Sequence, residues 1–339
     1  MPTVARFTLL SAVLSMPPAN SALRHVPQTP NAILSAVALT FQISALFLTP
    51  ILWHWSGWAF AAFLAAYCYV TVLCWLLIHE GIHYKLLASR KYNDLLGRAH
   101  SITFGCPFHI LKIGHMTHHR YNRGELDSNE WIPSETKLFP VWWLAYYARI
   151  LCLMYVSEVI SPLVFFFWKR SKRLITAFTK NQALPAILNL FTHRMVRAIQ
   201  MDAVLSVAFL AAQFYFNRWD LRPLIILLLA RAFIVSFYDN AYHYGTDAYD
   251  LQAANNLSVP EFLRPIILNH NLHRIHHRYP TASWAVLREL EQRDGEKFDA
   301  SLASTIWQQL KGPMRRPEKG GRTGADRDTD LPASLAAAE

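Results

Sequence analysis

Charged residues are scarce in this sequence. Asp, Glu, Lys and Arg make up 17% of its 339 residues, whereas they make up about 25% of an average soluble domain. Hydrophobic residues account for 53%. The composition therefore argues against an ordinary cytosolic enzyme.

Cysteine motifs and cofactor fingerprints are also lacking. The four cysteines form no Cys-x-x-Cys pair, which argues against a disulfide framework or a thiolate zinc site. The sequence has no Gly-rich dinucleotide fingerprint, no flavin motif and no fused haem domain. It also lacks the basic and aromatic array of a nucleic-acid-binding module, so we expect no nucleic-acid partner and attribute much of the net charge of +10 to contact with anionic lipid headgroups.

Long uncharged runs are present instead. Residues 33–53 and 58–78 each form 21 residues without Asp, Glu, Lys or Arg, enough to cross roughly 30 Å of hydrocarbon as a helix. Residues 198–217 and 223–238 are weaker candidates because they contain Asp202 and Arg231. We predict that they form a second transmembrane hairpin, since a span tolerates a polar residue that faces protein.

A further apolar stretch, residues 138–168, is interrupted by Arg149, Glu158 and Pro162 and starts with several Trp and Tyr residues. This pattern is typical of helices that lie at the level of the lipid headgroups. We therefore predict interfacial helices here and not a span. No alternating pattern is long enough to predict a strand.

The distribution of basic residues predicts the orientation. Residues 84–135 contain seven Lys or Arg and residues 136–197 contain nine, whereas the turn at 54–57 has none and the turn at 217–222 has two. By the positive-inside rule, both long segments and both termini face the cytoplasm. The predicted fold is an all-α integral membrane protein, with four transmembrane helices in two hairpins, interfacial helices and a cytoplasmic helical cap.

The predicted organisation has three parts. Residues 1–31 form an N-terminal cytoplasmic or interfacial segment, and residues 32–311 form the membrane domain. Residues 312–339 are rich in Gly, Pro, Arg and Asp and then in Ala, a composition that predicts a disordered tail.

Fifteen histidines are present, and eight of them fall into three short motifs. These are His79 and His83; His115, His118 and His119; and His273, His276 and His277. Spacings of three and four residues place the imidazoles of each motif on one helix face. Neutral imidazole is a good ligand for iron, zinc, copper or nickel, and eight imidazoles exceed what one catalytic zinc uses. The motifs therefore predict a site for two metal ions.

From the first span to about Pro280, the chain resembles the membrane fatty acid desaturase and hydroxylase superfamily, whose mark is three such histidine boxes. The resemblance implies two non-haem iron ions held by the box histidines, with O2 as co-substrate. It also implies four transmembrane helices under a cytosolic cap, a lipid or fatty acyl substrate and an external electron donor of the ferredoxin, rubredoxin or cytochrome type.

A further ligand in the family lies beyond the fourth span, in an Asn-x-x-x-His arrangement that this sequence matches with Asp239 and His243. The resemblance implies that His243 binds iron. Asp239 replaces the Asn and is expected either to bind the same iron or to lie close to it. His100, His109 and His270 have no box position, and we expect them at the polar surface or beside the ligands.

The resemblance of residues 270–280 favours desaturation, so we predict a fatty acid (acyl-lipid) desaturase. Hydroxylation or ketolation of a lipid or carotenoid by the same centre is the main alternative. A different hypothesis takes residues 79–83 as the HExxH motif of a zinc protease with Glu80 as general base, but it leaves six box histidines unexplained. A non-enzymatic metal or haem membrane protein would need fewer and differently placed ligands.

Overall fold

The computed structural model describes residues 21–124, 126–127, 130–133, 135–137, 139–181, 183–250 and 252–317. Most of the predicted N-terminal segment and of the predicted C-terminal tail lies outside the described residues. The short helix α2 (Ser21–Arg24) is the first described element.

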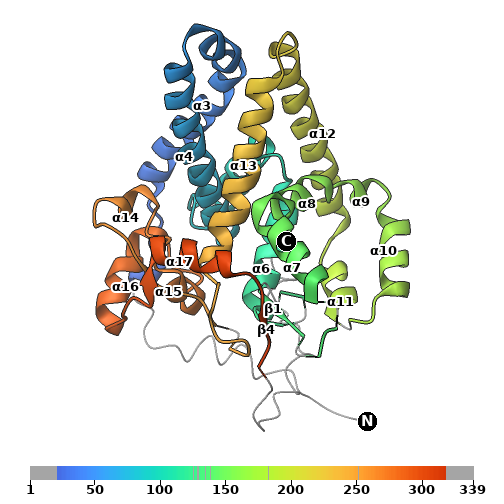
Figure 1. The fold of residues 1–339 in the computed structure, drawn as a ribbon, viewed down its shortest axis with the longest axis vertical. Coiled ribbons are helices and arrows are strands. Elements are labelled where there is room, and N and C mark those ends of the chain that lie inside the picture. The colour runs from blue at the N-terminus through green and yellow to red at the C-terminus, as the bar shows by residue number, and fades with distance from the viewer. Residues whose placement is uncertain are drawn as a thin grey trace.

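Two helical hairpins form one end of the molecule, as predicted. Helices α3 (Gln28–Trp55) and α4 (Gly57–Ile82) make the first, and α12 (His193–Phe216) and α13 (Arg222–Ala241) make the second. Figure 1 shows them side by side with their turns at the same end. The indole Nε1 of Trp53 donates a hydrogen bond of 2.8 Å to Asp220, which joins the two turns.

The hairpins carry apolar side chains on their outer faces. Val207 is 66% exposed and Leu229 is 61% exposed, although both are aliphatic. Exposed apolar surface on long helices is expected where lipid replaces water as the surroundings.

The charged residues that weakened the prediction of two spans, Asp202 and Arg231, are buried against protein. Asp202 accepts hydrogen bonds of 2.7 and 3.0 Å from the guanidinium of Arg98. Arg231 donates to the side chain of Gln42 and to the carbonyl of Thr103, each at 2.8 Å. Both charges therefore face protein, as the prediction of a second hairpin requires.

Helices α5 (Arg90–Phe104) and α6 (Phe108–Tyr121) pack against α4. Gly97 permits this packing, because a Cβ at that position would lie 2.6 Å from the ring of Phe108. Gly105 ends α5 with a φ of +101°, a conformation that favours glycine. The close approach places α6, with the second histidine box, beside the end of α4 that carries the first.

A run of short helices follows: α7 (Phe139–Ala148), the π-helical turn η1 (Arg149–Leu153), α8 (Met154–Ile160), α9 (Leu163–Phe166), α10 (Trp168–Phe178) and α11 (Ala183–Asn189). By length and composition alone, Phe139–Phe166 is one of five candidate spans in the described part of the chain. In Figure 1 it lies beside the half of α13 that is remote from the hairpin turns. The count of four spans thus stays a prediction.

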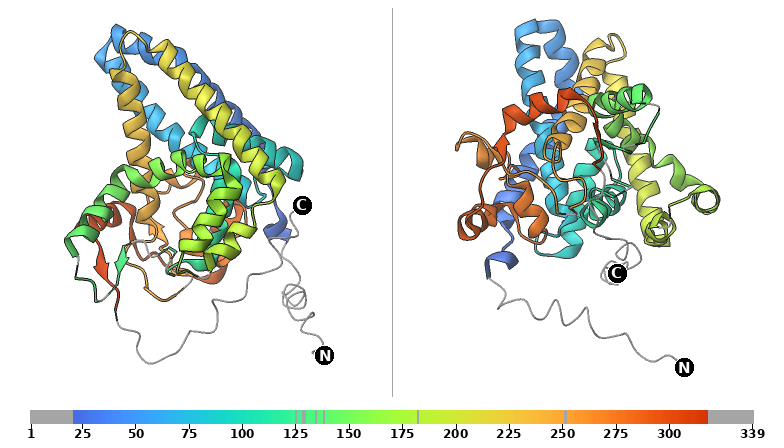
Figure 2. Two further views of the ribbon diagram at one scale, coloured as in Figure 1. Left: turned by 90° about the vertical axis from the view of Figure 1, so that its right-hand side faces the viewer. Right: turned by 60° about the horizontal axis from the view of Figure 1, so that its bottom comes forward.

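The C-terminal region lies at the open end of the hairpins, remote from their turns (Figure 2). It contains α14 (Leu263–Ile266), α15 (His273–Arg278), η2 (Trp284–Val286), α16 (Leu287–Asp294), α17 (Leu302–Gln308) and η3 (Gln309–Lys311). Trp284 ties this region to the first hairpin, because its indole donates to Asn31 at 2.9 Å and its backbone N–H donates to Glu80 at 3.3 Å.

Two small parallel strand pairs complete the fold. Strand β1 (Trp131–Ile132) pairs with β4 (Met314–Arg315), and β2 (Leu257–Ser258) pairs with β3 (Ala300–Ser301). The sequence did not predict them, because two residues are too few for an alternating pattern.

Candidate metal centre

Four segments bring the predicted ligands to one place. His79 lies in the last turn of α4 and His83 caps that helix, while the second box lies on α6 and the third on α15. His243 follows α13 by two residues. All nine predicted histidines face one another there, in two groups.

The first group contains five histidines, whose candidate ligand atoms all lie within 4.8 Å of one another: His79, His83, His115, His119 and His276. The Nε2 atom of His276 is 3.0 Å from that of His79 and 3.0 Å from that of His119. The Nε2 atom of His115 is likewise 3.0 Å from those of His83 and His119.

The second group contains four histidines within the same limit of 4.8 Å: His118, His243, His273 and His277. The Nε2 atom of His118 lies 3.1 Å from that of His243 and 3.3 Å from that of His277. The Nε2 atoms of His243 and His273 are 3.1 Å apart.

The chemistry of these donors fits metal ions. Burial lowers the pKa of His83 to about 3 and holds the pKa of His119 and of His276 well below the usual value, so these rings are neutral. A neutral imidazole has one N–H and one lone pair, and rings that meet through the same Nε2 atom cannot all satisfy one another by hydrogen bonds. A cation between them would accept every lone pair at once.

Two rings of the second group are oriented by neighbouring oxygens. The Nδ1 atom of His118 is hydrogen-bonded to the carboxylate of Asp127, and that of His243 lies 3.2 Å from the carbonyl oxygen of Ala253. Such contacts turn the Nε2 lone pair toward a metal. Burial favours neutral His118, but the carboxylate of Asp127 outweighs it and raises the pKa of the ring.

Asp127 was missed by sequence reasoning. It lies in the loop after α6, nine residues beyond His118, between other acidic residues. The proximity of an acidic residue to the second box was a signal, but the spacing alone could not select one carboxylate among several.

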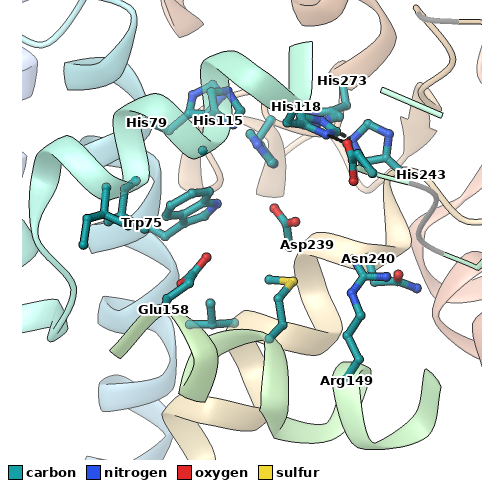
Figure 3. A pocket seen from close by; sticks show the side chains of 17 residues that line it. Trp75, His79, His115, His118, Arg149, Glu158, Asp239, Asn240, His243 and His273 are labelled. Carbon is teal, nitrogen blue, oxygen red and sulfur yellow. Dashed lines mark hydrogen bonds and ion pairs between the residues drawn. The ribbon is translucent and has the colours of Figure 1, made fainter. Parts of the chain in front are cut away.

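A cavity of about 260 Å³ lies directly beneath the imidazoles. Figure 3 shows the carboxylates of Asp239 and Glu158 pointing into it from α13 and α8. Asp239 belongs to neither histidine group found among the described residues. Arg149 and Glu158, whose charges interrupt the apolar stretch, also line this cavity.

His100, His109 and His270, for which the sequence predicted a place at the polar surface or beside the ligands, differ from one another. His100 is completely buried and His109 is partly buried, and neither belongs to the two groups found among the described residues. His270 is 5% exposed, with its ring centroid 5.3 Å from that of His79 and 4.6 Å from that of His273. His270 therefore lies beside the predicted ligands.

The geometry does not favour the protease hypothesis. Glu80 would have to activate a water molecule, but its carboxylate is buried and accepts a hydrogen bond from the backbone of Trp284. His79 and His83 face three further histidines and not an open position.

Comparison with known proteins decides the family. Residues 26–309 match the family model described as fatty acid desaturase. The chain belongs to the fatty acid desaturase family. The family is the one that the histidine boxes and the long apolar helices predicted.

Two curated relatives are similar over part of the chain. It is 28% identical to the sn-1 oleoyl-lipid 12-desaturase of Anabaena variabilis over 116 residues, which cover 33% of this chain and 30% of that protein. It is 32% identical to the sn-1 oleoyl-lipid 12-desaturase of Arthrospira platensis over 96 residues, which cover 28% of this chain and 24% of that protein. The matched stretches thus span less than a third of either relative.

Proposed function

We propose that this chain is a membrane-bound, O2-dependent acyl-lipid desaturase that holds two iron ions with nine histidines. His79, His83, His115, His119 and His276 would hold one ion, and His118, His243, His273 and His277 would hold the other. The observation that carries the proposal is that imidazoles from four separate segments meet in two groups, each within 4.8 Å. Asp239 would lie close to the second ion without binding it.

The iron ions, when bound, would supply the oxidising power needed to remove hydrogen from an unactivated methylene, which side chains cannot supply. The protein would hold the acyl chain of the substrate and exclude bulk water from it. Trp75, Met154 and Val235 give the cavity beneath the imidazoles apolar walls, against which a methylene can rest. Asp127 would keep the ring of His118 in the orientation that binds metal.

We also propose how the protein lies in the membrane. The two hairpins would provide four spans, and α7 to α9 would lie at the interface. The histidines and both termini would then face the cytoplasm, where an external donor of the ferredoxin, rubredoxin or cytochrome type can deliver electrons. The support is the Lys and Arg asymmetry of the connecting segments.

The substrate class follows from the family and from the two relatives, whose names describe oleoyl-lipid desaturases. An acyl chain of a membrane lipid is therefore the proposed substrate, and formation of a C=C bond is the proposed reaction.

Expression in a host with simple lipids tests this function. We expect total acyl chains analysed by mass spectrometry to contain a product that has lost two hydrogens. A His118→Ala variant, which removes one predicted ligand, should give none. A product that has gained one oxygen, in acyl chains or pigments, would instead show hydroxylation or ketolation. Unchanged lipids from a protein that is fully loaded with iron would contradict the proposal.

A further inference from the structure

A second cavity adjoins the one beneath the imidazoles. It has a volume of about 430 Å³ and lies between α6 and the short helices α9 to α11. Ile110, Gly114, His118 and Asp127 line both cavities. The two spaces therefore adjoin along α6, directly beside a predicted ligand.

The second cavity is lined mainly by hydrocarbon. Phe165 and Trp168 stack with ring centroids 4.8 Å apart, and Phe191 packs against both rings. Leu188 and Ile113 add aliphatic walls. The two polar residues that line both cavities, His118 and Asp127, lie on the side of the second cavity that faces the histidines. Such a space suits a hydrocarbon chain that continues toward the metal centre.

Gly114 lies at the junction. A Cβ added there would meet no heavy atom of the described residues within 4 Å, and its helical backbone does not require glycine. Gly97 and Gly81 differ, because a Cβ at either position would approach the ring of Phe108 within 2.6 or 3.3 Å. Packing therefore explains those two glycines but not Gly114, although glycine weakens a helix relative to alanine.

We infer that Gly114 keeps open a passage through which the hydrocarbon chain of the substrate extends from beneath the imidazoles into the cavity between α6 and α9 to α11. The absent side chain is what the passage needs, because any larger residue would project into the space that the chain crosses. This inference rests on the proposed function for its choice of an acyl chain as occupant. Its structural basis is that Gly114 lines both cavities and that a Cβ there would stand in open space.

The full chain in membranes provides the test. Gly114→Leu should lower formation of the desaturated product at least tenfold, with the same amount of protein in the membrane and the same iron content. Gly57→Leu is the matched control, because a Cβ at Gly57 also meets no atom within 4 Å, yet this residue lies at the distant turn between α3 and α4. It should leave product formation unchanged. Wild-type product formation in iron-loaded Gly114→Leu would overturn the inference.

A second variant applies if Gly114→Leu loses iron. Leu184→Trp fills the second cavity from α11, away from the histidines. It should keep its iron and still lose product, and unchanged product would refute the passage.

Photolabelling separates this inference from the proposed function. A phosphatidylcholine with a diazirine in its acyl chain should crosslink to residues 184–191 of the wild-type chain, whether or not turnover occurs. Crosslinks without a desaturated product would contradict the proposed function alone. A desaturated product without these crosslinks would contradict the passage alone.

Discussion

Single contacts decide how each predicted ligand is presented. His118 has the carboxylate of Asp127 on its Nδ1 side, whereas His243 has the carbonyl oxygen of Ala253 there. Asp239 differs from both histidines, because its side chain points into the cavity and it belongs to neither of the two histidine groups found among the described residues. The roles of His243 and Asp239 should therefore separate on substitution.

We expect His243→Ala to lower bound iron and to reduce turnover by more than about 100-fold, since even loss of a residue that only orients a ligand costs 10- to 100-fold. Asp239→Asn, which keeps the shape of the side chain and restores the residue of the family pattern, should retain both iron ions. Metal analysis of the two purified variants, beside the amount of protein in membranes, gives the comparison. Full iron and normal turnover in His243→Ala would leave the eight box histidines to hold the metals alone.

Elements differ in how far the sequence predicts them. The four hairpin helices could be predicted because each one needs only a long apolar run. The ends of these helices could not be predicted. Helix α3, for example, begins at Gln28, and the buried side chain of Asn31 in its first turn donates hydrogen bonds of 2.9 and 3.0 Å to the carbonyls of Lys85 and Leu86. That contact joins residues more than 50 positions apart, and no local pattern contains it.

The same limit applies to the candidate site. The nine histidines could be identified because their spacing is local or matches a family pattern. Asp127, Glu158 and Gly114 belong to no motif, and only tertiary packing brings them to the cavities. The sequence located the charges of Arg149 and Glu158 within an apolar stretch, but it could not predict that both side chains line the cavity.

We predict that the segment from α7 to α9 does not cross the membrane. If it does not cross the membrane, cysteines placed before and after it must lie on one side. We expect Glu135→Cys and Lys169→Cys, both exposed, to react with an impermeant reagent from the cytoplasmic face, and Arg218→Cys at a hairpin turn to react from the other. Cys68 and Cys152, which are partly exposed, should first be replaced by alanine. Labelling of the first two positions from opposite faces would make the segment a fifth span.

At the scale of the whole molecule, the two hairpins and the C-terminal region together position the histidines of one site. The first box lies at the end of α4, His243 follows α13, and the C-terminal region carries the third box on α15 to the same place. Trp284 fastens that region to α3 and α4 through Asn31 and Glu80. Elements that are distant in the sequence must therefore all be in place before the two histidine groups exist.

Metal content of the purified chain tests the central claim most directly. Two groups of imidazoles, five and four in number, predict about two iron ions per chain. Elemental analysis should find this iron without equivalent zinc, and the absorption spectrum should show no haem band. One zinc ion per chain with no iron, or a haem band, would contradict the account.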